Sequence, residues 1–281
     1  MAKIPKIALI GNPNAGKSSL FNTLTGLRQK TGNFPGVTMD KLTGIWKVGP
    51  KNEIEILDLP GIYSIYPKSI DEELVINILG NPANPDYPDM VIVVADASNL
   101  KRNLLLFSQV RDLGIPTVLA LNMIDVAENE GYVINSIKLA RELSVEVAEV
   151  NAKKGIGVNG LKLSVQKTLE NRFASNDGLP LPVSEELISE IQAQFGEAEP
   201  YRSLLWLMEH DRMKMFSKAQ CADFDEIMVN HDFQPKKYKS AETVKRYEFL
   251  TEVVDRCVIN LNRQWDAPPV KTWTDRLDKL F

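Results

Sequence analysis

The stretch that decides the fold is Gly11-Asn-Pro-Asn-Ala-Gly-Lys-Ser18, which directly follows the apolar run from Ile7 to Ile10. This spacing of glycine, lysine and serine is typical of a loop between a strand and a helix whose backbone amides bind phosphate groups. A helix that begins near Lys17 points the positive end of its dipole at the same anion. The sequence therefore predicts that Lys17 reaches the β- and γ-phosphates of a nucleotide and that the Ser18 hydroxyl binds Mg²⁺.

The composition of the chain is that of a folded, water-soluble protein, and its length allows two domains. Of its 281 residues, 44% are hydrophobic and 25% are charged, and the formal net charge is -4. This net negative charge argues against an extended surface that binds nucleic acid, so no nucleic-acid partner is expected. Cys221 and Cys257 have no CxxC spacing, which favours free thiols in a reducing compartment. The N-terminus leads straight into the first apolar run, so no signal peptide is expected.

Up to about residue 172, short β-branched runs alternate with segments of helical periodicity. This alternation predicts an α/β fold with a mostly parallel sheet of six or more strands and helices on both faces. Ile54 and Ile56 alternate with glutamates, which favours an outer strand, whereas the apolar run from Val91 to Val94 favours a central one. The expected strands cover 6–10, 42–48, 53–57, 90–95, 117–121 and 146–150, and the expected helices cover 17–25, 71–79, 100–113, 133–143 and 159–171.

The pattern changes to helix only after residues 174–183, which are rich in Gly, Pro and polar residues. We therefore expect residues 1–172 to form one domain and residues 173–281 to contain a linker and a small all-α domain. Ser184 is expected to cap the first helix of that domain. Later helices are expected at 201–208 and 243–262, and in the second of these an apolar stripe predicts the face that packs in the core. The stripe contains Val244, Tyr247, Leu250, Val254, Cys257 and Leu261.

Two motifs at the ends of expected strands specify the nucleotide. Asp58-Leu-Pro-Gly61 places a carboxylate that can hold a Mg²⁺-bound water and a Gly61 amide that can donate to a γ-phosphate oxygen. Asn122-Met-Ile-Asp125 places the Asp125 carboxylate where it can accept hydrogen bonds from N1 and N2 of guanine. Adenine has no matching donors, and the carboxylate would then be desolvated without a partner. The two motifs together predict a preference for guanine nucleotides.

Two further segments complete the predicted site. Asn151-Ala-Lys153 follows the sixth expected strand, and the Ala152 amide is a candidate donor to the guanine carbonyl oxygen. The loop from Thr31 to Met39 offers Thr38 as a hydroxyl ligand to Mg²⁺ and as a backbone contact to the γ-phosphate. The full set of expected nucleotide and metal contacts is Gly11, Asn12, Pro13, Asn14, Ala15, Gly16, Lys17, Ser18, Ser19, Gly36, Val37, Thr38, Asp58, Gly61, Asn122, Met123, Asp125, Asn151, Ala152 and Lys153.

The order and spacing of these motifs resemble those of the translation-factor-related small GTPases, over about the first 170 residues. In closer detail, the phosphate loop, Gly32-Asn-Phe-Pro-Gly-Val-Thr38 and Asp58-Leu-Pro-Gly-Ile-Tyr-Ser64 resemble the cytosolic part of the bacterial ferrous iron transport protein B family. Arg246-Tyr-Glu-Phe-Leu250 in the helical part is similar to that family as well. The resemblance implies an α/β P-loop GTPase domain followed by a helical domain that stabilises bound GDP.

The resemblance also implies a location and partners. Thr274-Asp-Arg-Leu-Asp-Lys-Leu-Phe281 is similar to the stretch just before the first membrane helix of that family, which would place this chain at the cytoplasmic face of a bacterial inner membrane. The implied partners are GTP or GDP, a transmembrane region after residue 281, small accessory iron-transport proteins and a second copy of the chain. The implied role is a GTP-hydrolysing module that regulates ferrous iron transport.

Two features bear on the rate of hydrolysis. Ile62 stands where many small GTPases have a glutamine that orients the attacking water, and no arginine lies between Gln29 and Asp40, so slow intrinsic hydrolysis is expected. In cation-dependent GTPases that the phosphate loop resembles, the asparagine at the position of Asn14 helps bind K⁺ beside the β- and γ-phosphates. The alternative is that Asn14 only holds the loop through side-chain to backbone hydrogen bonds. The groups expected to act in catalysis are Asn14, Lys17, Thr38 and Gly61.

Two other functions stay open at the level of sequence. One is a soluble GTPase that acts in ribosome assembly or tRNA modification, although the chain has no basic segment interleaved with aromatic residues that would bind RNA. The other is a nucleotide sensor whose occupancy gates its partner, with hydrolysis too slow to matter.

Overall fold

The computed structural model describes residues 4–26, 29–33, 40–49, 52–171 and 178–263. In this part of the chain, seven strands form one sheet in the order β2-β3-β4-β1-β5-β6-β8. Neighbouring strands from β4 to β8 are parallel, whereas β3 is antiparallel to both β2 and β4. The predicted α/β class is therefore confirmed. The strands are β1 Lys6–Gly11, β2 Gln29–Asn33, β3 Asp40–Lys47, β4 Glu53–Asp58, β5 Met90–Asp96, β6 Thr117–Asn122 and β8 Glu146–Glu149.

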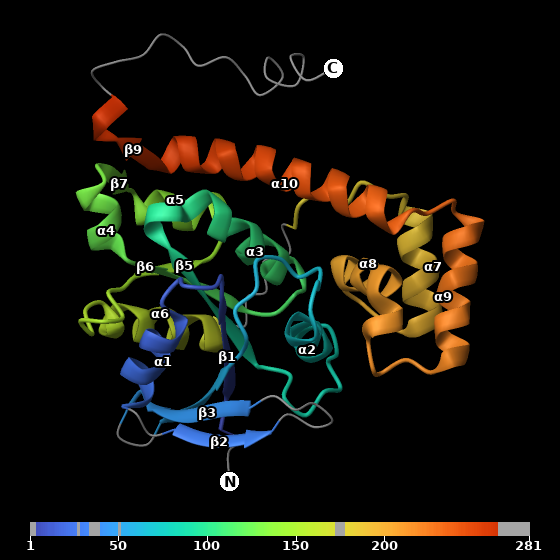
Figure 1. The fold of residues 1–281 in the computed structure, drawn as a ribbon, viewed down its shortest axis with the longest axis horizontal. Helices are drawn as coiled ribbons and strands as arrows, with labels where there is room; N and C mark the ends of the chain where they lie inside the picture. Colours follow the sequence, from blue (N-terminus) through green and yellow to red (C-terminus); the bar gives the residue numbers. More distant parts are fainter. Residues whose placement is uncertain (1–3, 27–28, 34–39, 50–51, 172–177, 264–281) are drawn as a thin grey trace.

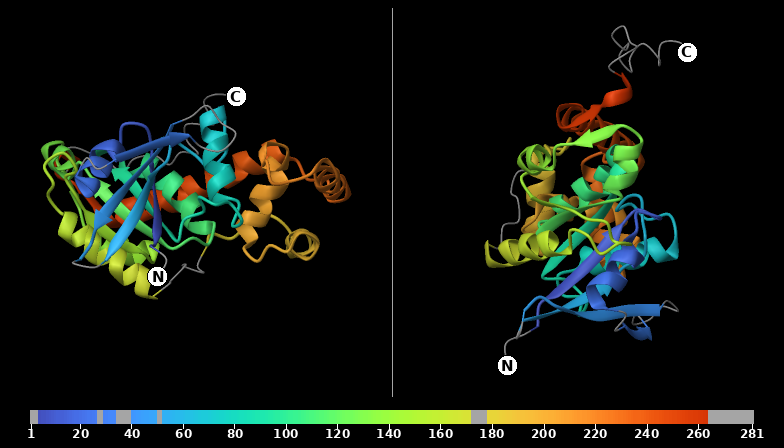
Figure 2. Two further views of the ribbon diagram at one scale, coloured as in Figure 1. Left: turned by 90° about the horizontal axis from the view of Figure 1, so that it is seen from below. Right: turned by 90° about the vertical axis from the view of Figure 1, so that its left-hand side faces the viewer.

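Helices cover both faces of the sheet (Figures 1 and 2). Successive residues of β1 alternate between the two apolar clusters, with Leu9 in the cluster that includes α1 and α6 and Ile10 in the cluster that includes α2, α3 and α5. Both faces of the central strands are buried, which explains their unbroken apolar sequence. The helices are α1 Lys17–Thr25, α2 Ile70–Leu79, α3 Leu100–Asp112, α4 Ile124–Asn129, α5 Ser136–Leu143 and α6 Val158–Asn171.

The C-terminal part described by the structure is helical and packs on the sheet-bearing part. It contains α7 Glu185–Phe195, α8 Pro200–Glu209, α9 Lys218–Asn230 and α10 Pro235–Cys257. We call these four helices together the helical segment. As expected, Ser184 caps α7 and accepts a hydrogen bond from the Leu187 amide at 3.3 Å. The apolar cluster that contains α2 and α3 continues into this segment without a break.

Helix α10 connects the two ends of the molecule. It runs from α7, α8 and α9 along α3 and α5 and ends beside β7 Tyr132–Ile134 (Figure 1). The chain then forms β9 Val258–Asn260, which pairs antiparallel with β7. Helix α10 therefore joins the helical segment to the sheet-bearing part through its contacts with α3 and α5. The division of the chain at residue 172 falls next to residues outside the described ranges, and it stays a prediction.

The expectation that β4 is an outer strand is wrong. β4 lies inside the sheet, between β3 and β1. Its Glu53 and Glu55 share a face with Leu57, and of these three only Leu57 is buried. The alternation of apolar residues and glutamates in β4 thus has a different cause. On the face that carries the glutamates, β4 is covered only near its carboxyl end, at Leu57. The apolar run in β5 lies between β1 and β6, which confirms its central position.

The expected buried face of the last helix is only partly correct. Leu250 and Cys257 are buried, but Val244 and Leu261 are exposed. The helix ends at Cys257, and the polar residues Glu242 and Arg246 occupy its buried face instead. A pattern search for apolar residues cannot find that face, because charged residues are buried only where another element supplies a partner.

Some elements were not expected from the sequence. These are β2, α4, α9 and the small ribbon of β7 and β9, whose first strand occupies the start of the helix expected at 133–143. In the part of the chain that the structure describes, no helix combines the length and the apolar character needed to cross a membrane.

Candidate nucleotide-binding site

The predicted motifs meet at the carboxyl edge of the sheet. β1 ends at Gly11, β4 at Asp58, β6 at Asn122 and β8 at Glu149, and these strands are mutually parallel. Their carboxyl ends therefore lie along one edge, which is where open α/β sheets bind ligands. The fold brings together motifs that are more than 100 residues apart in sequence.

The phosphate loop owes its shape to residues with positive φ. Gly16 has a φ of 88° and Asn14 a φ of 66°. A Cβ atom at position 16 would lie 2.0 Å from the side-chain amide nitrogen of Asn122, so only glycine fits there. Gly16 is also the N-cap of α1, and no side chain caps the first turn of this helix. The first amides of α1 are thus available to an anion at the positive end of the helix dipole.

Lys17 and Asp58 form an ion pair inside the site. The Lys17 Nζ atom lies 2.5 Å from Asp58 Oδ1, and both side chains are about nine-tenths buried. Burial raises the pKa of Asp58 above its ordinary value, while the charge and the hydrogen bond of Lys17 oppose part of that rise. A buried carboxylate with one cationic partner can accept a metal-bound water when the lysine moves to a phosphate.

Gly61 and Ile62 hold the segment after Asp58 against the phosphate loop. The Ile62 amide donates to the Gly11 carbonyl oxygen at 3.2 Å, and a Cβ atom at position 61 would lie 3.2 Å from the Pro13 nitrogen. The Ile62 side chain is fully buried in the apolar core. It therefore points away from the site and cannot orient a water molecule.

Asn122 joins the phosphate loop to the loop after β8. Its Nδ2 atom donates to the Ala15 carbonyl oxygen at 2.9 Å, and its Oδ1 atom accepts from the Ala152 amide at 3.0 Å. The side chain is buried, so both bonds are protected from water. The next residue, Met123, has a φ of 62° and places Asp125 in the first turn of α4. Asn122 therefore sets the spacing between the phosphate side and the base side of the site.

Asp125 lies at the more exposed end of the site. Its Oδ2 atom accepts hydrogen bonds from Asn151 Nδ2 at 2.8 Å and from Lys154 Nζ at 2.9 Å. The hydrogen bond from Lys154 is the main reason why the pKa of Asp125 is lowered, so this carboxylate is ionised at neutral pH. An ionised, oriented carboxylate is the acceptor that the two N–H groups of guanine require.

Most of the predicted residues that the structure describes lie together, and the structure adds three details that the sequence did not give. Lys154, rather than Lys153, contacts Asp125, and nothing in the sequence distinguishes these adjacent lysines. The Ala152 amide already donates to Asn122, so it would have to exchange that bond to meet a guanine oxygen. Asn12 is buried, and its amide atoms have no partner among the described residues. The predicted residues Gly36, Val37 and Thr38 lie outside the described ranges.

The fold and these motifs define the class of P-loop GTPase domains. The family whose model matches residues 5–165 is Ferrous iron transport protein B. Because the match covers more than half of the sequence, the chain belongs to the ferrous iron transport protein B family.

Individual relatives support the same family. The Fe(2+) transporter FeoB of Leptospira biflexa is 42% identical over 291 residues, which cover 99% of this chain and 41% of the relative. The cytosolic domain of L. pneumophila FeoB superposes with a TM-score of 0.74 at 31% identity, over 90% of this chain and 99% of that domain. A GDP-bound mutant of the S. thermophilus FeoB G-domain gives a TM-score of 0.69 at 33% identity, over 91% of this chain and all of that domain. The chain thus spans about two-fifths of the length of the Leptospira relative.

Proposed function

We propose that this chain is the GTP-binding and GTP-hydrolysing module that regulates a bacterial ferrous iron transporter. The observation that carries the proposal is the Asn122 side chain, which bonds to the phosphate loop and to the loop after β8 at once. This arrangement supports a ligand with phosphates at one end and a base beside Asp125 at the other. The relative from S. thermophilus was solved with GDP, which favours a guanine nucleotide as that ligand.

The residues present fit a Mg²⁺–nucleotide complex. Ser18 follows Lys17 in the first turn of α1, and Asp58 at the end of β4 contacts Lys17. Ser18, Asp58 and Thr38 would hold the ion, and bound Mg²⁺ neutralises charge on the phosphate oxygens. With the nucleotide bound, Lys17 would donate to the phosphates instead of Asp58, and the Gly61 amide would donate to the γ-phosphate oxygen.

The same site supports a K⁺ ion at Asn14. Asn14 is exposed, and among the described residues its side chain makes no hydrogen bond that would hold the loop. Because the Asn14 side chain is exposed, its amide oxygen is available as a ligand. A cation there would supply the positive charge beside the phosphates that an arginine would otherwise provide, since no arginine lies between Gln29 and Asp40.

The family assignment favours transport over the alternative of a soluble GTPase for ribosome assembly or tRNA modification. In this proposal the module lies at the cytoplasmic face of the inner membrane and acts on the transmembrane region of its own transporter. Accessory iron-transport proteins and a second copy of the chain are further proposed partners. A polytopic partner is consistent with a chain that spans only two-fifths of its Leptospira relative.

Phosphate release from GTP tests both the reaction and the cation. We expect the chain with Mg²⁺ to hydrolyse GTP about tenfold faster in KCl than in NaCl, which corresponds to about 1.4 kcal/mol of barrier. Asn14→Ala should remove this difference. The matched control is Asn129→Ala, an exposed asparagine at the end of α4, which should keep it.

The other outcomes decide between the remaining hypotheses. Equal rates in both salts would contradict the role of Asn14. Single-turnover hydrolysis much slower than nucleotide release would instead favour a sensor, in which exchange rather than hydrolysis is the switch.

A further inference from the structure

The ribbon of β7 and β9 has an exposed apolar face. Val133 and Ile259 are paired directly across the two strands, and they are 46% and 55% exposed. Their neighbours in the strands, Ile134 and Val258, pack against the apolar core. Because side chains alternate between the two faces of a ribbon, one face is covered by the core and the outer face carries Val133 and Ile259. Two apolar residues that face each other across the strands form one surface, unlike apolar residues that are exposed singly.

A groove on α5 lies next to this ribbon and carries positive charge. Its volume is about 420 Å³, and its lining residues are Asn135, Ile137, Lys138, Arg141 and Glu142. Ile137 is 70% exposed, and among the described residues neither Lys138 nor Arg141 makes an ion pair. The charge of Glu142 is balanced by Arg256 of α10 at 2.9 Å. The groove therefore combines an exposed apolar side chain with net positive charge.

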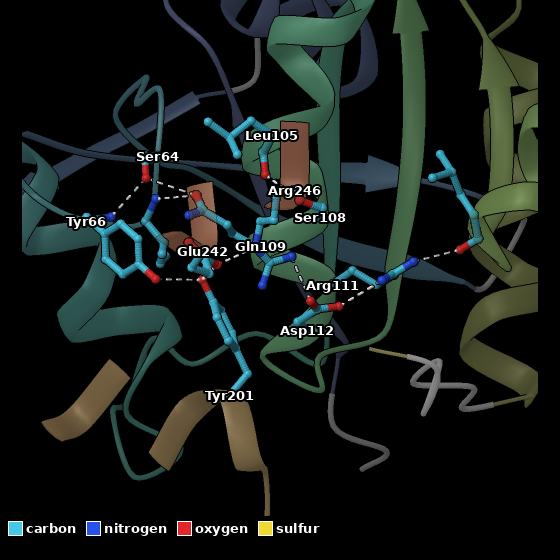
Figure 3. A network of polar contacts seen from close by, with 12 residues as sticks. Ser64, Tyr66, Leu105, Ser108, Gln109, Arg111, Asp112, Tyr201, Glu242 and Arg246 are labelled. Atoms are coloured by element: carbon cyan, nitrogen blue, oxygen red, sulfur yellow. Dashed lines mark hydrogen bonds and ion pairs between the residues drawn. The ribbon is translucent and has the colours of Figure 1, made fainter. Parts of the chain in front are cut away.

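Several contacts hold the groove and the ribbon in fixed positions. The Asn135 amide donates to the carbonyl oxygen of the last residue of α10 at 2.8 Å. At the other end of α5, the Leu143 carbonyl oxygen accepts from Arg111 of α3 at 3.2 Å. Arg111 and Arg246 of α10 also bond to the two carboxylate oxygens of buried Asp112, at 2.9 and 2.7 Å (Figure 3). Helix α5 is thus attached at both ends, and the groove and the ribbon form one preformed surface.

The charges around the ribbon are unevenly distributed. The cations Lys138 and Arg141 follow β7, in α5, whereas the exposed carboxylates of Glu128 and Glu130 precede it, in and just after α4. An anionic surface is attracted by the first pair and repelled by the second. The favourable approach for such a surface is therefore over α5 and the ribbon rather than over α4.

The last described element of the chain lies at this surface. β9 is followed directly by the short helix η3 Leu261–Arg263. Figure 1 shows β7, β9 and the end of α10 together at one end of the molecule, whereas α7, α8 and α9 lie at the other. In the proposed function a transmembrane region follows residue 281. The ribbon and η3 are then the described elements closest to that region along the chain.

We propose that Val133, Ile137, Lys138, Arg141 and Ile259, which we call the ribbon–α5 surface, bind the anionic lipid surface of the membrane. The proposal rests on the proposed function, because only a module of a membrane transporter is placed beside a bilayer. The apolar side chains enter the headgroup region, and the two cations contact lipid phosphates. Since α4 packs against β7 and carries Asp125, this contact fixes the orientation of the nucleotide site relative to the bilayer.

The electrostatic part is tested by co-sedimentation of the chain with lipid vesicles. Vesicles of equal parts phosphatidylcholine and phosphatidylglycerol should bind the chain, and added salt should weaken binding because it screens exposed charges. Lys138→Ala/Arg141→Ala should lower the partition coefficient about 20-fold, since each cation near an anionic surface contributes about fivefold. Lys236→Ala/Lys237→Ala removes the same charge from exposed lysines at the other end of α10, and its partition coefficient should stay within about twofold of that of the unchanged chain.

The apolar part is tested separately. Ile137→Ser should lower the partition coefficient about fivefold, because it removes apolar surface that the lipid would cover. The matched control is Val229→Ser in α9, which also replaces an exposed apolar residue and should bind like the unchanged chain. In the unchanged chain, vesicles should slow amide hydrogen exchange in β7 and β9 but not in α9.

The other outcomes distinguish failure of this proposal from failure of the proposed function. Equal losses in the two double variants would show that charge acts without this surface, and would overturn the proposal. A chain that binds a fluorescent GDP analogue but no vesicles would overturn the lipid contact alone. Self-association that Ile137→Ser abolishes, without vesicle binding, would assign the surface to a second copy of the chain and overturn the lipid contact. Failure to bind GDP, with the vesicle results as expected, would overturn the proposed function alone.

Discussion

Two lysine–aspartate pairs lie in the candidate site, one on the phosphate side and one on the base side, and they differ in burial. Lys17 and Asp58 are only 12% and 11% exposed, whereas Lys154 and Asp125 are 60% and 41% exposed. The pKa of Asp58 is raised by burial, and that of Asp125 is lowered by its hydrogen bond from Lys154. The same two residue types therefore produce opposite shifts, because desolvation prevails in one place and pairing in the other.

The difference indicates distinct roles for the two lysines. In the proposed function, the lysine on the phosphate side would contact the phosphates, and Asp58 would accept a hydrogen bond from a metal-bound water. On the base side, the aspartate would contact the ligand in that proposal, and the lysine would only orient the aspartate. Removing one member of a buried ion pair costs much free energy, because a charge is left buried without a partner. Removing one member of an exposed ion pair costs little.

The largest effect is expected for Lys17→Ala. Affinity for GDP should fall at least about 100-fold, because hydrogen bonds to charged groups contribute about 1.5–3 kcal/mol each. Titration with a fluorescent GDP analogue measures this loss. A decrease of less than about fivefold, the scale expected of an exposed pair, would mean that the two pairs are equivalent.

The same variant should also change the pH dependence of stability. The folded pKa of Asp58 is already raised, so the folded state holds its proton to a higher pH than the unfolded chain. The resulting stability is present at low pH and is lost as the pH rises through the folded pKa. Without Lys17 that pKa rises further, so thermal unfolding should show a steeper loss of stability towards neutral pH than in the unchanged chain.

A smaller effect, confined to base selectivity, is expected for Asp125→Ala. The ratio of GTP to ATP affinity should fall about 10- to 100-fold, because the guanine N–H groups lose their acceptor. The phosphate side contributes equally to both nucleotides, so ATP affinity itself should change little. Competition of GTP and ATP against a fluorescent GDP analogue gives both values. An unchanged GTP:ATP ratio would remove the base-recognition role of Asp125.

The phosphate side was easier to predict from the sequence than the base side. Its geometry comes from the backbone, and Gly16, Lys17 and the end of β1 fix that backbone locally. The base side is built from side chains of separate loops, so the bond from Asn122 to Ala152 and the choice of Lys154 over Lys153 depend on how those loops meet. The spacing of these residues in the sequence does not show how the loops contact each other.

The same distinction applies to the fold. The parallel strands could be predicted because their buried faces demand unbroken apolar runs, as in β5. The buried face of α10 could not, because Glu242 and Arg246 are stabilised by Tyr201 and Asp112 from elements far away in the sequence. β9 was missed because its three residues pair with a strand more than 100 positions earlier.

The smallest effect, and the sharpest test of the contrast between the pairs, is expected for Lys154→Ala. An exposed ion pair contributes little, so GDP affinity should decrease by no more than about threefold and base selectivity should persist. Asn151 still donates to the same Asp125 oxygen at 2.8 Å, which keeps the carboxylate oriented. Competition assays on Lys154→Ala and on the adjacent control Lys153→Ala should therefore give similar values. A loss for Lys154→Ala as large as that for Asp125→Ala would show that the lysine contacts the ligand itself, and the two sides of the site would then bind by the same principle.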